Sequence, residues 1–162
     1  MKRNLQESES HYSLDFEYFD DETVIKFQLS SPHATTVSLP HAKGHLKEHL
    51  PSIFESKCFN DLDLPFYQEV NDTEIAHLFE HMLLVNLYEK KRKYYSYAKY
   101  DGVTKWNASY PNLFKIFINA GRKESAVFEL ALQKSIDLLN DLLQRKTDSS
   151  PSVCLAGNRE II

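Results

Sequence analysis

The clearest pattern in the first part of the chain is an alternation of apolar and polar residues, which is typical of half-buried β-strands. In residues 12–19, aromatic or aliphatic side chains alternate with serine, aspartate and glutamate. A second such stretch, residues 23–29, follows an acidic segment at positions 20–22 that reads as a turn. The two stretches are therefore predicted to be strands that pair as a β-hairpin.

Two longer segments have the periodicity of α-helices. Residues 73–89 are apolar on nearly every side, which predicts a helix that is buried in the core. Asn71 is the expected N-cap, with Glu74 as its reciprocal capping partner. A basic run at positions 90–93 suits the C-terminal end of this helix. The second predicted helix spans residues 124–144 and has one continuous apolar side.

The remaining expected elements are shorter: a strand at 34–39, a helix at 40–54 that breaks near Pro51, and strands at 94–100, 103–106 and 113–119. The order of elements predicts an α+β domain, with a mainly antiparallel sheet and helices packed on one face. Residues 1–145 are expected to form this single domain. The serine- and proline-rich residues 146–162 are expected to be a flexible tail.

Composition and charge argue against several classes of function. The net charge of −4 argues against a general nucleic-acid binder. The chain has only four glycines and no glycine-rich phosphate-binding pattern, so no nucleotide cofactor is expected. No apolar run is long enough to span a bilayer, which argues against a membrane partner. With two cysteines, no disulfide framework and no secretory signal, a cytoplasmic protein is expected. The sequence is compatible with either a monomer or a homo-oligomer.

The central predicted helix carries His77, Glu80 and His81 in the order H-x-x-E-H. Residues three and four apart lie on one face of a helix, so the three side chains converge. Two such imidazoles can hold Zn²⁺, and the glutamate can act as a base on a bound water. This order is the inverted form of the zinc-protease helix. The alternative is a hydrogen-bonded polar cluster in the core.

Two other features have plainer interpretations. His41, His45 and His49 share one face of the helix predicted at 40–54, and they are expected to be mostly at the surface because the apolar stripe lies on another side. Cys58 is expected to be a small packed side chain rather than a nucleophile.

From Leu50 onward the chain resembles the N-terminal domain of cyanophycin synthetase. The features in common, in order, are Leu50-Pro51, Cys58, Phe66, the H-x-x-E-H helix, the turn Gly102-Val103-Thr104-Lys105, the strand at 113–119 and the helix from Glu124. The loop at 60–66 departs from the family, which is glycine-rich there. The chain lacks the length for the ATP-grasp and Mur-ligase-like domains of the full synthetases. The resemblance therefore implies a stand-alone copy of the N-terminal domain.

In that family the domain docks an Asp/Arg polymer, and some members are zinc-dependent hydrolases of the inverzincin type. Inverzincins take a third metal ligand from a glutamate on a later helix, which implies Glu124 here, with Glu129 as the alternative. Lys105 and Arg122 are candidates for stabilising an oxyanion, or are solvated charges. Trp106 is a candidate substrate contact, or packs on the sheet.

Two functions follow as hypotheses. The first is a zinc-dependent peptide hydrolase that acts on an Asp/Arg polymer or a related basic peptide, with Glu80 as the catalytic base. The acidic side chains between positions 61 and 74 would attract such a substrate, or are simply solvated. The second is a non-catalytic module on the same fold that binds a polymer or a protein, since other family members keep the fold without the activity.

Overall fold

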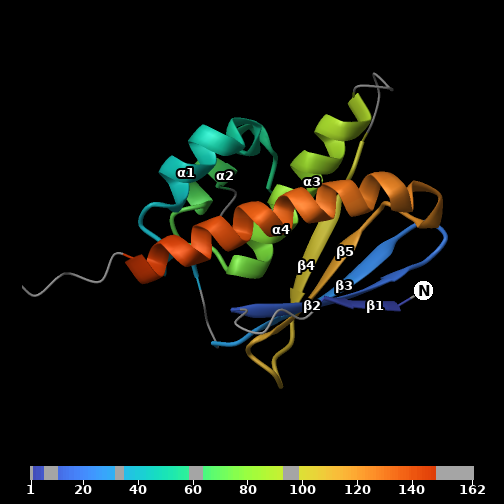
Figure 1. Ribbon diagram of the computed structural model, residues 1–162, viewed down its shortest axis with the longest axis horizontal. Helices are drawn as coiled ribbons and strands as arrows, with labels where there is room; N and C mark the ends of the chain where they lie inside the picture. The colour runs from blue at the N-terminus through green and yellow to red at the C-terminus, as the bar shows by residue number, and fades with distance from the viewer. Residues whose placement is uncertain (1, 6–10, 32–34, 59–63, 93–98, 149–162) are drawn as a thin grey trace, which may run out of the picture.

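The computed structural model describes residues 2–5, 11–31, 35–58, 64–92 and 99–148 (Figure 1). They form an α+β domain, as predicted. Its sheet has five antiparallel strands in the order β1-β2-β3-β5-β4. Their bounds are β1 Lys2–Leu5, β2 Tyr12–Tyr18, β3 Thr23–Leu29, β4 Gly102–Trp106 and β5 Leu113–Ile118. Within the described residues, β1 and β4 are therefore the two edges of the sheet.

The strand predictions are largely confirmed. The predicted hairpin is β2 and β3, which pair from Tyr12↔Leu29 to Tyr18↔Thr23. The strand β1 was not predicted, because its sequence, KRNL, has no alternation of apolar and polar residues. The prediction of a strand at 34–39 is wrong, since Thr35 forms only an isolated bridge and the 3-10 helix η1 (Thr36–Ser38) follows it. Most of the strand expected at 94–100 lies outside the described residues.

The helices are α1 (Ala42–His49), α2 (Phe66–Glu69), α3 (Ile75–Arg92) and α4 (Ser125–Asp148), with 3-10 helices η2 (Pro51–Glu55) and η3 (Arg122–Glu124). The predicted break near Pro51 is confirmed. Asn71 does not cap α3; its side chain donates a hydrogen bond to the carbonyl of Gln68 in the preceding turn. The helix α4 continues to Asp148, and residues 149–162 of the predicted tail lie outside the described part of the chain.

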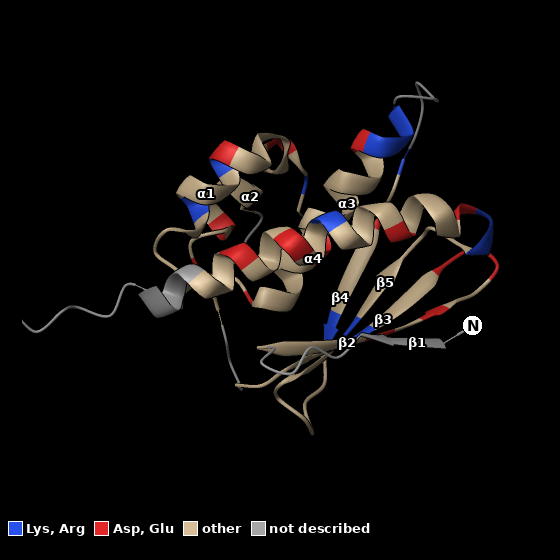
Figure 2. Ribbon diagram, viewed as in Figure 1, with Lys and Arg blue, Asp and Glu red and all other residues tan. Residues whose placement is uncertain are grey.

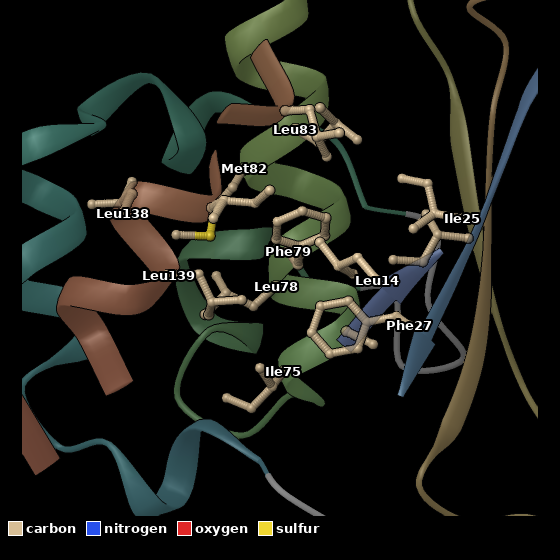
Figure 3. Close-up of a cluster of buried hydrophobic side chains, with 14 of the residues drawn as sticks. Leu14, Ile25, Phe27, Ile75, Leu78, Phe79, Met82, Leu83, Leu138 and Leu139 are labelled. Carbon is tan, nitrogen blue, oxygen red and sulfur yellow. The ribbon is translucent and has the colours of Figure 1, made fainter. Parts of the chain in front are cut away.

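The core lies between one face of the sheet and the helices. Figure 3 shows Leu14, Ile25 and Phe27 of the sheet facing apolar side chains of α3, and the rings of Phe27 and Phe79 lie 5.3 Å apart. The helix α4 lies beside α3 on the same face of the sheet, where the ring of Phe128 packs against those of Phe16 and Tyr18 (Figure 1). Asn86 and Ser135 join these two helices through a buried hydrogen bond of 2.9 Å. None of the described helices has the length and apolar character needed to cross a membrane.

Among the described glycines, Gly121 is the one whose substitution is expected to destabilise the fold most. A Cβ atom at this position would lie 2.0 Å from the carbonyl oxygen of Asp20, which belongs to the backbone of the β2–β3 turn. Because backbone cannot move aside as a side chain can, Gly121→Ala should lower the free energy of unfolding by about 3 kcal/mol. Urea denaturation measures this loss.

Gly44 provides the matched control. A Cβ atom at Gly44, inside α1, would meet nothing within 4 Å. Gly44→Ala should therefore be neutral or should raise the free energy of unfolding by about 0.5–1 kcal/mol, because alanine has the higher helix propensity. Equal effects of the two substitutions would contradict the tight contact at Gly121.

Candidate metal centre

Three potential metal ligands converge beside the N-terminal half of α3. His77 and His81 come from this helix, and Cys58 comes from the segment that follows η2. One ligand atom from each lies within 4.8 Å of the others, and Cys58 Sγ is 3.5 Å from His77 Nε2. Tetrahedral zinc separates its nitrogen and sulfur ligands by about 3.3–3.6 Å, given the usual bond lengths. The distance from Cys58 Sγ to His77 Nε2 therefore matches the spacing that zinc requires, and the ligand atom of His81 lies within 4.8 Å of both.

The surroundings of His77 leave its Nε2 atom available as a ligand. On the other side of the ring, Nδ1 lies 3.4 Å from Glu69 Oε1 and 3.1 Å from Thr73 Oγ1. A carboxylate can only accept a hydrogen bond, so this contact favours the tautomer with the proton on Nδ1. The lone pair of Nε2 then faces Cys58. Metal-binding histidines are commonly oriented by a carboxylate in this way.

His81 is held in the same tautomer by a different partner. The hydroxyl of Ser56 donates its single proton to the carbonyl of Ile53 at 2.6 Å. The Ser56 oxygen must therefore accept the proton of His81 Nδ1, which is 2.9 Å away. The ring of Phe66 stacks on the imidazole with its centroid at 3.9 Å. Burial, together with the neighbouring His77, lowers the pKa of His81 to about 3, so the imidazole is neutral at physiological pH.

Glu80 lies between the helix and strand β4. Its carboxylate is buried and accepts a hydrogen bond from the hydroxyl of Thr104. Burial raises the pKa of Glu80, whereas the hydrogen bonds from Thr104 and the proximity of His77 act in the opposite direction. A Cβ atom at Gly102 would lie 2.8 Å from Glu80 Oε1. The glycine that begins β4 thus makes room for the carboxylate.

A cavity of about 600 Å³ opens onto these groups. Its walls come from α2, α3, β4 and β5, and from the segments before α2, α3 and β4. Four carboxylates line it, while Lys57 is its only lysine or arginine among the described residues. The carboxylates belong to Glu69, Glu74, Glu80 and Asp101. The basic residues at the end of α3 lie at the opposite end of that helix from His77 (Figure 2). The cavity is therefore acidic.

The structure does not bring the expected third ligand to this centre. Glu124 pairs with Lys91 and accepts a hydrogen bond of 3.0 Å from the hydroxyl of Tyr100. It is not among the described residues that could hold a metal together, and neither is the exposed Glu129. Cys58 occupies that place instead. It is partly buried, as a packed side chain would be, but its sulfur faces His77.

Of the three predicted substrate-binding residues, the structure places only Trp106 at the cavity, where the indole is 58 % exposed. The ammonium group of Lys105 lies over the ring of Phe117, on the sheet face that points away from the helices. Arg122 lies at the start of η3 and donates a hydrogen bond to the carbonyl of Tyr18. Neither charge lines the cavity.

The histidines of α1 are also separate from the metal centre. His49 is exposed as expected, but His45 is buried, which corrects the prediction that this face lies at the surface. His45 is buried because α1 packs against η2 and α4, and its ring lies 4.3 Å from that of His49. His41 Nε2 is 3.0 Å from the carbonyl of Leu142, so it contacts α4.

No family model matches this sequence, and no curated protein matches it. The function is therefore inferred from the side chains of the centre. They supply two imidazoles whose Nδ1 atoms contact Glu69 and Ser56, one thiol, and one buried carboxylate beside an open acidic cavity. Nitrogen and thiolate ligands are those that zinc prefers in proteins.

Proposed function

We propose that this protein is a zinc-dependent peptide hydrolase, with Cys58, His77 and His81 as metal ligands and Glu80 as the catalytic base. The observation that carries the proposal is the convergence of three ligand atoms beside a carboxylate that is not one of them. Structural zinc usually has four protein ligands, whereas catalytic zinc has three and one open position. Among the residues that the structure describes, this centre offers three.

The roles of the residues follow from their positions. Bound zinc would activate a water molecule and polarise the carbonyl of the scissile amide. Glu80 would accept a proton from the attacking water and pass it to the leaving nitrogen. Thr104 holds the carboxylate of Glu80 on the side that faces β4. His77 and His81 are fixed through their Nδ1 atoms by Glu69 and Ser56, so both rings stay oriented towards the centre.

The lining of the cavity supports a basic substrate. Four carboxylates face this space, so arginine or lysine side chains of a peptide would find opposite charges there. The resemblance to the N-terminal domain of cyanophycin synthetase supports an Asp/Arg polymer or a related basic peptide. We propose this class as the substrate.

The metal content of the purified protein tests the proposal. We expect about one zinc per chain after zinc loading and dialysis, and hydrolysis of an arginine-rich peptide that stops when a chelator removes the metal. His77→Ala should lose the metal. Glu124→Gln should keep it, because Glu124 pairs with Lys91 instead. A wild-type protein that binds no zinc would overturn the hydrolase and leave a binding module on this fold.

Glu69 is expected to act on the metal through His77. Replacing it with glutamine should weaken zinc binding about tenfold to a hundredfold, since an amide is a poorer acceptor for the Nδ1 proton than a carboxylate. Competition with a coloured chelator measures the change. Glu74→Gln is the matched control, because Glu74 also lines the cavity but is exposed. Equal zinc affinity in both variants would show that Glu69 does not orient His77.

A further inference from the structure

The strand β4 forms one side of the cavity and is also an edge of the sheet. It pairs only with β5 among the described strands, and its residues Gly102, Val103, Thr104 and Trp106 line the cavity. Figure 1 shows β4 at the end of the sheet opposite β1. The metal centre therefore lies beside a sheet edge that no other described strand pairs with.

The hydrogen bonds to β5 show which backbone groups of β4 point outward. Asn119 N–H donates to the carbonyl of Asp101, and Asn107 N–H donates to the carbonyl of Leu113. In an antiparallel ladder these bonds alternate, so the odd-numbered residues of β4 face β5. The N–H and C=O groups of Gly102, Thr104 and Trp106 consequently point towards the free edge.

The centre of this edge coincides with the catalytic base. Thr104 donates its hydroxyl proton to the carboxylate of Glu80. The backbone groups of Gly102 and Trp106 flank it on either side, within the part of the chain that the structure describes. A strand added outside β4, at the usual spacing of about 4.8 Å, would run alongside Thr104, whose hydroxyl contacts Glu80.

We propose that the cavity receives its substrate as an extended polypeptide strand that pairs with the free edge of β4. This inference rests on the proposed function, because it places a peptide bond beside Glu80 and the metal ligands. Backbone pairing with an open edge is a recurrent mode of peptide recognition, in which alternate side chains enter pockets. Here alternate side chains would point into the acidic cavity, which favours arginine or lysine at every second position.

An N-methyl scan of a peptide tests the pairing. The probe is a short fluorescein-labelled peptide of alternating arginine and valine, and its binding to the full chain is measured by fluorescence anisotropy, with and without zinc. N-methylation removes one backbone donor at a time. Methylation at alternate positions should weaken binding about threefold to tenfold, while the positions between should have little effect. A uniform effect along the peptide would overturn the strand pairing.

A pair of variants tests the same contact from the side of the protein. Trp106→Pro removes the indole and the outward N–H, whereas Trp106→Ala removes only the indole. Proline is tolerated at an edge position whose N–H makes no ladder bond. Trp106→Pro should bind the peptide about threefold to tenfold more weakly than Trp106→Ala. Equal affinities would contradict the proposal, provided that urea denaturation shows both variants to be folded.

Failure of the inference and failure of the proposed function give different results. If methylation at alternate positions weakens binding but the zinc-loaded protein hydrolyses no peptide, the strand pairing is supported and the hydrolase is overturned. If zinc-dependent hydrolysis occurs but the effect of methylation does not alternate along the peptide, the hydrolase is supported and the strand pairing is overturned.

Discussion

Replacing Glu80 with glutamine is expected to leave the zinc content unchanged and to lower peptide hydrolysis about a hundredfold to ten-thousandfold. Glutamine has nearly the shape of glutamate and can still accept the hydrogen bond from Thr104, but it cannot take a proton from water. The measurement is kcat with an arginine-rich peptide, beside zinc analysis of the same samples.

The same variant also separates catalysis from folding. Burial raises the pKa of Glu80, so the charged carboxylate is disfavoured in the folded protein, and glutamine removes that cost. We therefore expect Glu80→Gln to be at least as stable in urea as the wild type after removal of metal. Glu129→Gln is the control and should keep the rate, because Glu129 is exposed and is not among the residues that line the cavity. If Glu80→Gln hydrolyses peptide at the wild-type rate with its zinc retained, Glu80 is not the base.

The sequence predicts the fold well where one physical signal dominates. The strand at 23–29 agrees with β3 at both ends, because a sheet with one buried face requires apolar residues at every second position. The helix α3 is apolar on nearly every side, and it packs against both the sheet and α4. The strand β1 has no such signal, since the sequence KRNL contains only one apolar residue. Its place in the sheet follows from backbone pairing with β2.

The sequence predicts the part of the candidate site that lies on one helix, but not the part that comes from a distant segment. His77, Glu80 and His81 are neighbours on one helix, so their spacing alone places them together. Cys58 lies 19 residues before His77, and no local periodicity connects them. Only the path of the chain through η2 brings its sulfur to the imidazole. The expected ligand Glu124 is the last residue of η3, just before α4, and it faces Lys91 and Tyr100. Distant ligands depend on tertiary packing.

Replacing Cys58 with serine is expected to remove the thiolate ligand and to weaken zinc binding by more than the tenfold to hundredfold that is typical of outer-shell substitutions. Cobalt provides the direct measurement. Co²⁺ bound by a thiolate absorbs strongly in the near ultraviolet through sulfur-to-metal charge transfer. The wild-type protein should show this band together with the visible bands of tetrahedral cobalt. Cys58→Ser should lose the ultraviolet band.

Cys154→Ser is the matched control, because it removes the other cysteine of the chain. It should keep the charge-transfer band at full intensity, since Cys58 is the cysteine whose sulfur lies 3.5 Å from His77 Nε2. The opposite pattern, with the band lost only in Cys154→Ser, would assign the thiolate to Cys154. A wild-type protein that binds cobalt without any such band would exclude sulfur from the centre. In that case a carboxylate such as Glu69, which already contacts His77, would be the next candidate for the third ligand.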